Sequence, residues 1–253
     1  MENARIKKER IPIRTENVKD FYSKRAREKS NGHVDAPAVL CGDRDPSKIQ
    51  YWTNYELEHN IVNLRLDEAS KVLELGFGTG RISKYLIQGA GSYVGIDYVD
   101  EFVDLANSRN DIEKDKNCFF IKASFYDIMM KNVLLPVEFL FNRFVVSGGV
   151  MMYINDAELR KCILHLADFF DHQCILYISE PVAIEERLTL KDFYSEELHE
   201  NYNAIYRTVA EYNDLFTPLY RAGFVMKKSE PFFSEDIKGR KETKQWLFVM
   251  ERG

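Results

Sequence analysis

Three glycines stand at every second position in VLELGFGTGRIS, residues 72–83, directly after an apolar run. Gly76, Gly78 and Gly80 follow a strand-like segment, and a helical pattern begins at Arg81. Glycine at a strand-to-helix turn permits a tight bend and lets a ligand approach the backbone. The N-terminus of the helix adds free N–H groups and the positive end of its dipole. We therefore expect this loop to hold a ligand.

A carboxylate further along the chain indicates what this ligand contains. Asp97 closes the next strand-like run, SYVGID, about 20 residues after the glycines. At the end of a strand beside such a loop, a carboxylate can accept hydrogen bonds from both hydroxyl groups of a ribose. We therefore expect the ligand to contain a nucleoside. A strand–turn–helix unit that binds no ligand is the alternative.

The spacing G-x-G-x-G, preceded by Glu74, differs from the dinucleotide fingerprint G-x-G-x-x-G. VLELGFGTGR followed by GIDYVDEFVDLA resembles the small-molecule branch of the class I S-adenosylmethionine-dependent methyltransferases, and the resemblance covers roughly residues 71–253. It implies a Rossmann-like α/β fold with a mostly parallel seven-stranded sheet, an antiparallel C-terminal hairpin and an N-terminal helical lid. It also implies S-adenosyl-L-methionine as the cofactor. A nicotinamide-dependent dehydrogenase is the alternative.

The resemblance implies roles for individual residues. In it, Glu74 orders the glycine loop and reaches toward the amino group of the cofactor, and Asp97 binds the ribose. The segment FYSKRA resembles a lid-helix motif in which a tyrosine and an arginine, here Tyr22 and Arg25, contact the cofactor's carboxylate. A surface role is the alternative for both. The expected cofactor-binding residues are Tyr22, Arg25, Glu74, Gly76, Gly78, Gly80, Arg81, Asp97, Tyr98, Ser124, Phe125 and Ser147.

The chain departs from the family's pattern at two strand ends. Ser124 and Phe125 stand where the family usually has an aspartate or a similar polar pair, so a carboxylate contact there requires Asp127 to reach the ligand. In the fourth strand Asn142 replaces the usual aspartate. Ser147 would still face the sulfonium, and a plain strand end is its alternative reading.

The family's fold does not fix one catalytic base. Methyl transfer is an in-line displacement that requires alignment, exclusion of water and, for some acceptors, removal of a proton. The candidate bases are Glu180, Tyr153 and His33. Glu180 has the best position, because ligands of open α/β sheets bind beyond the carboxyl ends of the strands. A helix-capping or solvated carboxylate is the alternative for Glu180.

The elements that must position these residues alternate along the chain. The strand-like runs KVLELG, SYVGID, CFFIKA, FLFNRFVVS and CILYIS are separated by helical stretches, which predicts a parallel sheet with helices on both faces. Asn155 with Glu158, and Thr208 with Glu211, resemble capping boxes at helix starts. The first dozen residues are charged and without periodicity, so we expect them to be mobile.

We expect the chain to divide into a tail and helical lid over residues 1–66 and a cofactor-binding domain over residues 67–253. Residues 182–206 fit neither the strand–helix alternation before them nor the helix and hairpin pattern after them, and they are expected to form a substrate-lid insertion. Lid and insertion would enclose a pocket, which favours a small-molecule acceptor. Tyr206 and Arg207 are the expected substrate-binding residues, since an arginine beside a helix N-terminus can bind an anion.

The resulting interpretation is a methyltransferase that acts on a small molecule, at an oxygen of an anionic (phosphate-like or carboxylate) or sugar-linked metabolite. The stretch FNRFVVSGGVMMYIND resembles methyltransferases of capsular polysaccharide biosynthesis. An N-methyltransferase of a small amine and a catalytically silent cofactor-binding protein are the alternatives.

Composition bears on the remaining classes of function. The 253-residue chain has a formal net charge of −5, which disfavours sequence-tolerant nucleic-acid binding because that requires a basic face. Its four cysteines are widely spaced and form no Cys/His clusters. We therefore expect no metal binding, and we expect the protein to reside in a reducing compartment. No run of 18 apolar residues occurs. We expect a cytoplasmic monomer or homodimer that binds neither nucleic acid nor membrane.

Overall fold

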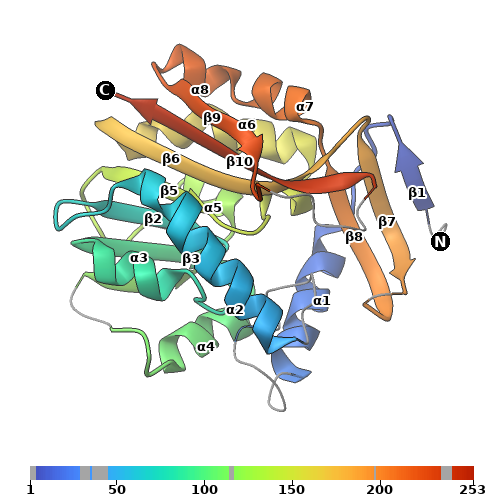
Figure 1. The fold of residues 1–253 in the computed structure, drawn as a ribbon, viewed down its shortest axis with the longest axis horizontal. Helices are drawn as coiled ribbons and strands as arrows, with labels where there is room; N and C mark the ends of the chain where they lie inside the picture. The colour runs from blue at the N-terminus through green and yellow to red at the C-terminus, as the bar shows by residue number, and fades with distance from the viewer. Residues whose placement is uncertain (1–3, 29–34, 36–44, 114–116, 197, 235–240) are drawn as a thin grey trace.

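The structure is a computed structural model that describes residues 4–28, 35, 45–113, 117–196, 198–234 and 241–253. A seven-stranded sheet runs through the centre of the molecule in the order β4-β3-β2-β5-β6-β10-β9 (Figure 1). The five strands from β4 to β6 are parallel, whereas β10 is antiparallel to both β6 and β9. This confirms the predicted fold class. The strands are β2 (Lys71–Leu75), β3 (Ser92–Asp97), β4 (Cys118–Lys122), β5 (Phe141–Val146), β6 (Phe170–Ala183), β9 (Val225–Pro231) and β10 (Thr243–Arg252).

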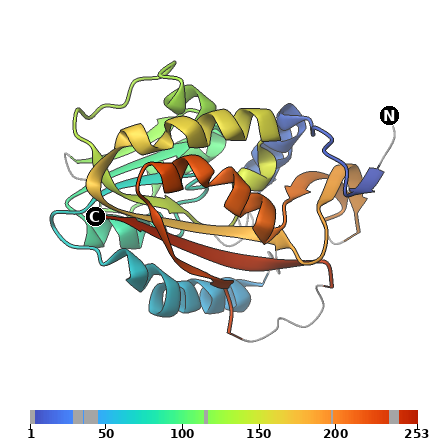
Figure 2. The same cartoon turned by 90° about the horizontal axis from the view of Figure 1, so that it is seen from above.

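Helices cover both faces of this sheet. Figure 2 shows α2 and α3 on one side of the strands and α6, α7 and α8 on the other. Each side has its own apolar core, the larger one centred on Leu159, Leu176 and Phe248 and the smaller one on Leu64, Leu86 and Tyr177. The helices are α1 (Thr15–Glu28), α2 (Pro46–Tyr55), α3 (Ser83–Gly89), α4 (Asp100–Ser108), α5 (Phe125–Met129), α6 (Asp156–Leu166), α7 (Val209–Leu215) and α8 (Thr217–Arg221).

Short helices of other types lie between these elements. A π-helical turn and a 3-10 turn follow α2 directly, a 3-10 turn precedes α6, and another follows it. They are η2 (Glu56–Asn60), η3 (Ile61–Leu64), η4 (Met151–Tyr153) and η5 (Ala167–Phe169). Among the described residues no helix is long and apolar enough to cross a membrane.

Strand β6 is much longer than the apolar run CILYIS that predicts it. Its pairing with β5 ends at Ile178, but its pairing with β10 continues to Ala183. The strand therefore projects beyond the carboxyl ends of its parallel neighbours. The chain that leaves it goes on to build a second sheet.

This second sheet is three-stranded and antiparallel, in the order β1-β7-β8, and lies at one end of the molecule (Figure 1). Its strands are β1 (Ala4–Lys7), β7 (Leu188–Ser195) and β8 (Glu200–Tyr206). The insertion predicted over residues 182–206 thus forms a hairpin. The expectation of mobility fails for residues 4–7, because Ala4 pairs with Lys191 and Lys7 with Leu188. The division of the chain at residue 66 stays a prediction.

The two predicted capping boxes have different outcomes. Thr208 and Glu211 form a complete capping box at the start of α7, as predicted. Asn155 precedes α6, but its side chain does not cap that helix. Its amide instead accepts a hydrogen bond from the backbone N–H of Ile13 (2.9 Å) and donates one to the carbonyl of the same residue (3.0 Å). Asn155 therefore fastens the N-terminal segment to the start of α6.

This two-way contact gives a ranking of variants that a helix cap would not give. Asn155→Ala loses both hydrogen bonds, and we expect the free energy of unfolding to fall by about 1–3 kcal/mol. Asn155→Asp should cost at least as much, because its carboxylate cannot donate to the Ile13 carbonyl and repels it. A helix cap would rank asparagine and aspartate alike, above alanine. Urea unfolding of the three proteins measures the order, and an Asp variant as stable as the parent would contradict it.

Candidate active site

One large cavity, of about 1220 Å³, opens beyond the carboxyl ends of the parallel strands. Open α/β sheets bind their ligands at this place. Its glycine-loop side includes Glu74, Leu75, Gly76, Phe77, Gly78, Asp97, Tyr98, Val99, Ser124 and Phe125. Its roof, formed by the second sheet, includes Arg5, Leu188, Leu190, Phe193, Ser195, Tyr202 and Tyr206. The cavity is thus bounded by both sheets.

The glycine loop leaves no room for a side chain at its first glycine. Gly76 has φ +71°, and a Cβ there would lie 2.3 Å from Cγ2 of Val150. Its N–H donates to the carbonyl of Ile96 at 2.7 Å, which fastens the loop to the end of β3. Gly78, at φ +56°, donates its N–H to the Asp97 carboxylate at 2.9 Å. The loop therefore presents bare backbone to the cavity.

Asp97 combines burial with unused accepting capacity. Its carboxylate accepts the N–H groups of Gly78 and Val99 at 2.9 and 3.0 Å, and the residue is only 6% exposed. Burial raises the pKa of this carboxyl to about 6. An ionised carboxylate offers about four lone-pair positions. Asp97 lines the cavity and can therefore accept further hydrogen bonds from a ligand.

Glu74 is the second buried carboxylate of the glycine-loop side. It accepts hydrogen bonds from the hydroxyl groups of Ser83 (2.6 Å) and Tyr93 (2.5 Å), both on Oε2. Burial raises its pKa to about 7. Because it lines the cavity at the end of β2, Glu74 can meet a positively charged group of a ligand.

The next strand end is also part of the glycine-loop side. Tyr98, Ser124 and Phe125 line the cavity, as the family resemblance implies. Asp127 does not replace the missing carboxylate contact. It forms a capping box with Ser124, accepting its hydroxyl at 2.7 Å, and also accepts the amide of Asn132 at 3.3 Å.

A polar network that sequence reasoning did not find connects α2, η2 and β6 with the loops that follow β2 and β5 at the cavity wall. Glu56, the first residue of η2, is 2% exposed and accepts hydrogen bonds from Ser147 (2.5 Å), Tyr177 (2.9 Å) and Arg81 (2.9 Å). Arg81 also donates to the Thr53 hydroxyl at 3.0 Å. The expected cofactor residues Arg81 and Ser147 therefore line the cavity with Glu56 between them.

One signal could have revealed Glu56. It lies seven residues after Ile49 and four after Trp52, so it occupies the apolar face of its helix. A charged residue on such a face needs partners when it is buried. The π-helical turn that begins there is also a feature that is frequent at functional sites.

The lid-helix motif contributes only one of its two residues to the cavity. Tyr22 lines the cavity and its hydroxyl hydrogen-bonds that of Tyr153 at 2.7 Å. Arg25 is not among the lining residues, and its guanidinium lies 5.6 Å from the centre of the Phe21 ring.

Two of the three candidate bases do not fit that role. Tyr153 lines the cavity, but burial raises its pKa well above 10, so it stays protonated. Glu180 is fully buried and outside the cavity lining. Its carboxylate accepts the backbone N–H groups of Val150 and Met151 at 2.7 Å and of Met152 at 3.3 Å. Glu180 therefore holds η4 against β6. The third candidate, His33, lies outside the described residues.

The predicted anion-binding arginine is also buried in the protein. Arg207 is 2% exposed and donates to the Asp156 carboxylate and to the carbonyl oxygens of Met151 and Ile154 at 2.7–2.8 Å. It does not line the large cavity. Arg207 directly precedes the N-cap of α7, but its side chain points into the protein, toward backbone carbonyl groups that need hydrogen-bond donors. Of the two expected substrate residues, only Tyr206 reaches the cavity.

Residues 72–170 match the family model of a methyltransferase domain. This part of the chain is a methyltransferase domain of the class I fold. The predicted family, enzyme class and S-adenosylmethionine cofactor are thereby confirmed. The structure fits this cofactor, because Asp97 can accept ribose hydroxyls, bare glycine backbone borders the cavity, and Glu74 can face the amino group. Among the described residues no group of three or more His, Cys, Asp or Glu could hold a metal ion.

Known proteins that are similar to this chain in sequence or in fold are named as methyltransferases of different substrates. Phosphoethanolamine N-methyltransferase 1 of Triticum aestivum is 26% identical over 141 residues, which is 46% of this chain and 27% of that protein. The chain thus spans about a quarter of this curated relative. Magnesium protoporphyrin IX methyltransferase of Synechocystis PCC 6803 with bound S-adenosylhomocysteine has TM-score 0.59 and 15% identity, covering 94% of this chain and 99% of that one. The N-methyltransferase NodS of Bradyrhizobium japonicum WM9 has TM-score 0.56 and 15% identity, covering 92% and 98%.

Asp97 gives the cofactor's affinity a predicted pH dependence. Ribose hydroxyls donate best to the ionised carboxylate, so bound cofactor lowers the pKa of Asp97 from its raised value of about 6. This contribution is present above that pKa and is lost as the pH falls through the pKa of the bound state. We expect calorimetry to show weaker binding of S-adenosylhomocysteine at pH 5 than at pH 8.

The variant Asp97→Asn supplies the control. It should bind at least about tenfold more weakly at pH 8, the loss expected for hydrogen bonds to a charged group, and its affinity should depend less on pH. An Asn variant with the parent's affinity at pH 8 would show that Asp97 does not bind the ribose.

Glu180 variants separate a structural role from a catalytic one. Glu180→Gln keeps an oxygen for the short hydrogen bonds from Val150 and Met151, so we expect a folded protein with turnover within a few-fold of the parent. Glu180→Ala leaves three backbone N–H groups without their acceptor and should lose about 3 kcal/mol or more of unfolding free energy. Thermal unfolding and S-adenosylhomocysteine release measure both. A Gln variant that is stable yet inactive would restore Glu180 as the base.

Proposed function

We propose that this protein transfers the methyl group of S-adenosylmethionine to an oxygen of an anionic small molecule. The observation that carries the proposal is the continuous cavity between the glycine loop and the roof. Its volume of about 1220 Å³ exceeds the ~300–1,000 Å³ of typical small-molecule sites. There is room for an acceptor beside the cofactor.

The composition of the roof favours a small acceptor over a macromolecule. Leu188, Leu190 and Phe193 of β7, with Tyr202 of β8, cover one side of the cavity beyond the carboxyl edge of the main sheet. Such a cover reduces the access of water to the reacting atoms and suits a molecule that fits beneath it. A protein or nucleic-acid segment would instead require an open groove.

Tyr153, Glu180 and Glu56 offer no free base to an acceptor, which favours an acceptor oxygen that is already ionised; Glu16 and Glu158 also line the cavity. Tyr153 stays protonated, Glu180 is turned away, and Glu56 is occupied by three hydrogen bonds. A hydroxyl acceptor needs a positioned base, whereas a carboxylate or phosphate-like oxygen is charged near neutral pH. Bound S-adenosylmethionine supplies a methyl carbon activated by a positive sulfur, and transfer of that carbon to an ionised oxygen releases no proton.

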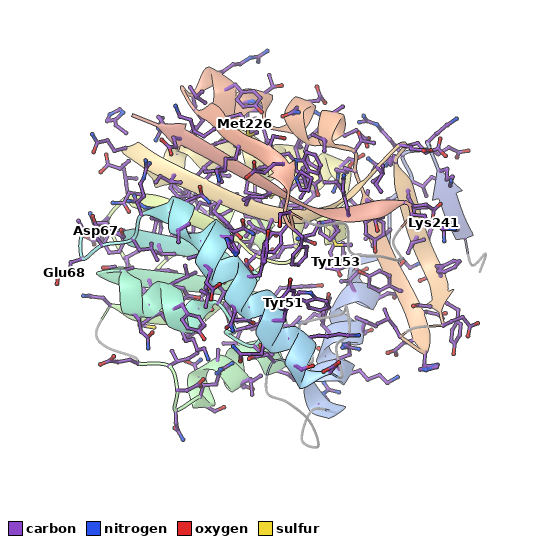
Figure 3. All side chains as sticks on the ribbon, in the orientation of Figure 1. Tyr51, Asp67, Glu68, Tyr153, Met226 and Lys241 are labelled. Atoms are coloured by element: carbon purple, nitrogen blue, oxygen red, sulfur yellow. The ribbon has the colours of Figure 1, made fainter. Side chains whose placement is uncertain are left out.

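Two lysines supply positive charge on the cavity wall. Lys241 and Lys244 line the cavity next to the first residue of β10, and Figure 3 shows Lys241 at the end of the molecule where the roof lies. Glu242, between them, is paired with Arg5 and Lys7. Among the described residues neither lysine forms an ion pair. They replace Arg207 as the cations that attract an acceptor.

A second candidate is N-methylation of a small amine. It is favoured by the curated relatives, which are named phosphoethanolamine N-methyltransferases. An amine that also carries a phosphate would satisfy the two lysines as well. The roles assigned to the chain's own residues are the same in both cases: binding, orientation and exclusion of water.

The test is release of S-adenosylhomocysteine with matched acceptor panels. One panel holds carboxylates, phosphate monoesters and sugar-linked phosphates, a second holds primary amines, and a third holds neutral alcohols. We expect turnover with the first panel, stronger than with the alcohols. Turnover confined to amines without an anionic group, or to neutral alcohols, would overturn the proposal.

Variants of the two lysines sharpen this test. Lys241→Ala and Lys244→Ala should each lower kcat/KM for an anionic acceptor by about fivefold, ~1 kcal/mol, a modest effect because solvent screens partly exposed charges. Cofactor affinity should not change. Lys227→Ala on β9 is the matched control, since it alters net charge equally but lies outside the cavity lining. Equal effects from all three variants would refute specific binding.

A further inference from the structure

Three buried tyrosine hydroxyl groups from distant parts of the chain meet in the cavity. Tyr22 comes from α1, Tyr153 from η4 and Tyr202 from β8. The hydroxyl of Tyr153 lies 2.7 Å from that of Tyr22 and 2.6 Å from that of Tyr202. All three residues are less than a tenth exposed, and all three line the cavity. Figure 3 shows Tyr153 in the interior, below the strand β10. We call this arrangement the tyrosine chain.

The tyrosine chain has one proton more than its internal hydrogen bonds use. Three hydroxyls carry three protons, and the two links consume two of them. Tyr202 is also hydrogen-bonded to Tyr206, which adds one hydroxyl and one link and leaves the count unchanged. Whichever way the hydrogen bonds run along the tyrosine chain, the hydroxyl at one of its ends therefore donates its proton to a group outside it.

Within the described structure, the side-chain hydrogen bonds of Tyr22, Tyr153 and Tyr202 run to other tyrosines. A ligand oxygen can accept the proton that these links leave over. An ammonium group cannot accept it, because it has no lone pair, and could meet the tyrosines only as a donor to a hydroxyl oxygen. The rings also pack on one another, because Tyr153 lies edge-to-face against Tyr22 (5.5 Å, 79°) and Tyr202 (6.1 Å, 87°). This packing holds the three hydroxyls in place beside the cavity.

We propose that the tyrosine chain binds an anionic oxygen group of the acceptor, a carboxylate or a phosphate. This rests on the proposed function and names the part of the site that recognises the substrate. An anion strengthens a hydrogen-bond chain that donates to it. Carboxylates and phosphates have more than one oxygen, so one can be held by the chain while another is presented for methylation.

The experiment measures binding apart from turnover. Parent protein saturated with S-adenosylhomocysteine is titrated with phenyl phosphate, benzoate and tetramethylammonium in a calorimeter. We expect the two oxyanions to bind and tetramethylammonium to bind more weakly than either. Tyr153→Phe and Tyr202→Phe should each weaken oxyanion binding by at least about tenfold, as for hydrogen bonds to charged groups, with affinity for S-adenosylhomocysteine within about twofold.

Tyr220→Phe is the matched control. Tyr220 of α8 donates its hydroxyl to Asn213 at 3.0 Å and lies outside the cavity lining, so its loss should leave oxyanion binding unchanged. Thermal unfolding checks that each variant is folded, and Tyr202→Phe replaces Tyr153→Phe if the latter does not fold. The proposal is overturned if no oxyanion binds the parent, if tetramethylammonium binds more tightly, or if folded Phe variants keep the parent's affinity.

The same measurements separate this inference from the proposed function. Oxyanion binding that depends on the tyrosines, without turnover of any anionic acceptor, would support the site and contradict O-methylation of an anion. Turnover of anionic acceptors with unaltered KM in both Phe variants would support the function and contradict the tyrosine chain as its recognition element.

Discussion

The antiparallel pairing of β6 with β10 is the constraint on which the position of the second sheet, the roof of the cavity, depends. It runs without interruption from Cys174 opposite Arg252 to Ala183 opposite Thr243. The parallel neighbour β5 leaves β6 at Ile178, so the last five residues of β6 are paired with β10, and Ala183 also donates its backbone N–H to the carbonyl of Arg207 at 2.9 Å. This projecting part carries the chain over the cavity and into β7. Without it, the cavity would lack the cover that the second sheet supplies.

Buried charges secure the projecting part rather than react with a ligand. Glu180 binds the backbone of η4, and Arg207 binds Asp156 together with carbonyl groups of η4 and the residue that follows it. Arg187, between β6 and β7, joins Asp156 to Glu211 at 2.9 Å. The N–H and C=O groups of a short 3-10 turn are not satisfied within it, so buried partners must come from elsewhere. Charged hydrogen bonds fill that need at the seam between the two sheets.

The sequence predicts the main sheet and the glycine-loop side well, because both depend on local signals. Apolar runs, turn glycines and a carboxylate at a strand end, such as Asp97, can each be recognised from a few neighbouring residues of the sequence. Glu180 shows the limit of such signals. The sequence predicts it at a strand end, whereas β6 continues past it to Ala183, and because β6 is buried on both faces no alternation tells which way a side chain points.

The remaining errors have a similar cause. The side chain of Arg207 is decided by carbonyl groups more than 50 residues away, and that of Asn155 by a residue 142 positions earlier. The four residues of β1 contain two charges and look like a polar tail, because their partner strand lies at Leu188–Ser195. The roof and the tyrosine chain are products of such distant contacts, which explains why sequence reasoning found Tyr22 and Tyr153 singly and not as members of one cluster.

The pairing of β1 with β7 has a consequence for the order of folding. Gly78 and Asp97 meet across 19 positions, whereas Ala4 and Lys191 must close a loop that contains most of the chain. Closure of a longer loop costs more entropy, and pairings distant in sequence form slowly. We therefore expect the glycine-loop side of the main sheet to fold first and the second sheet to form last. During synthesis, β1 stays unpaired until β7 has emerged from the ribosome.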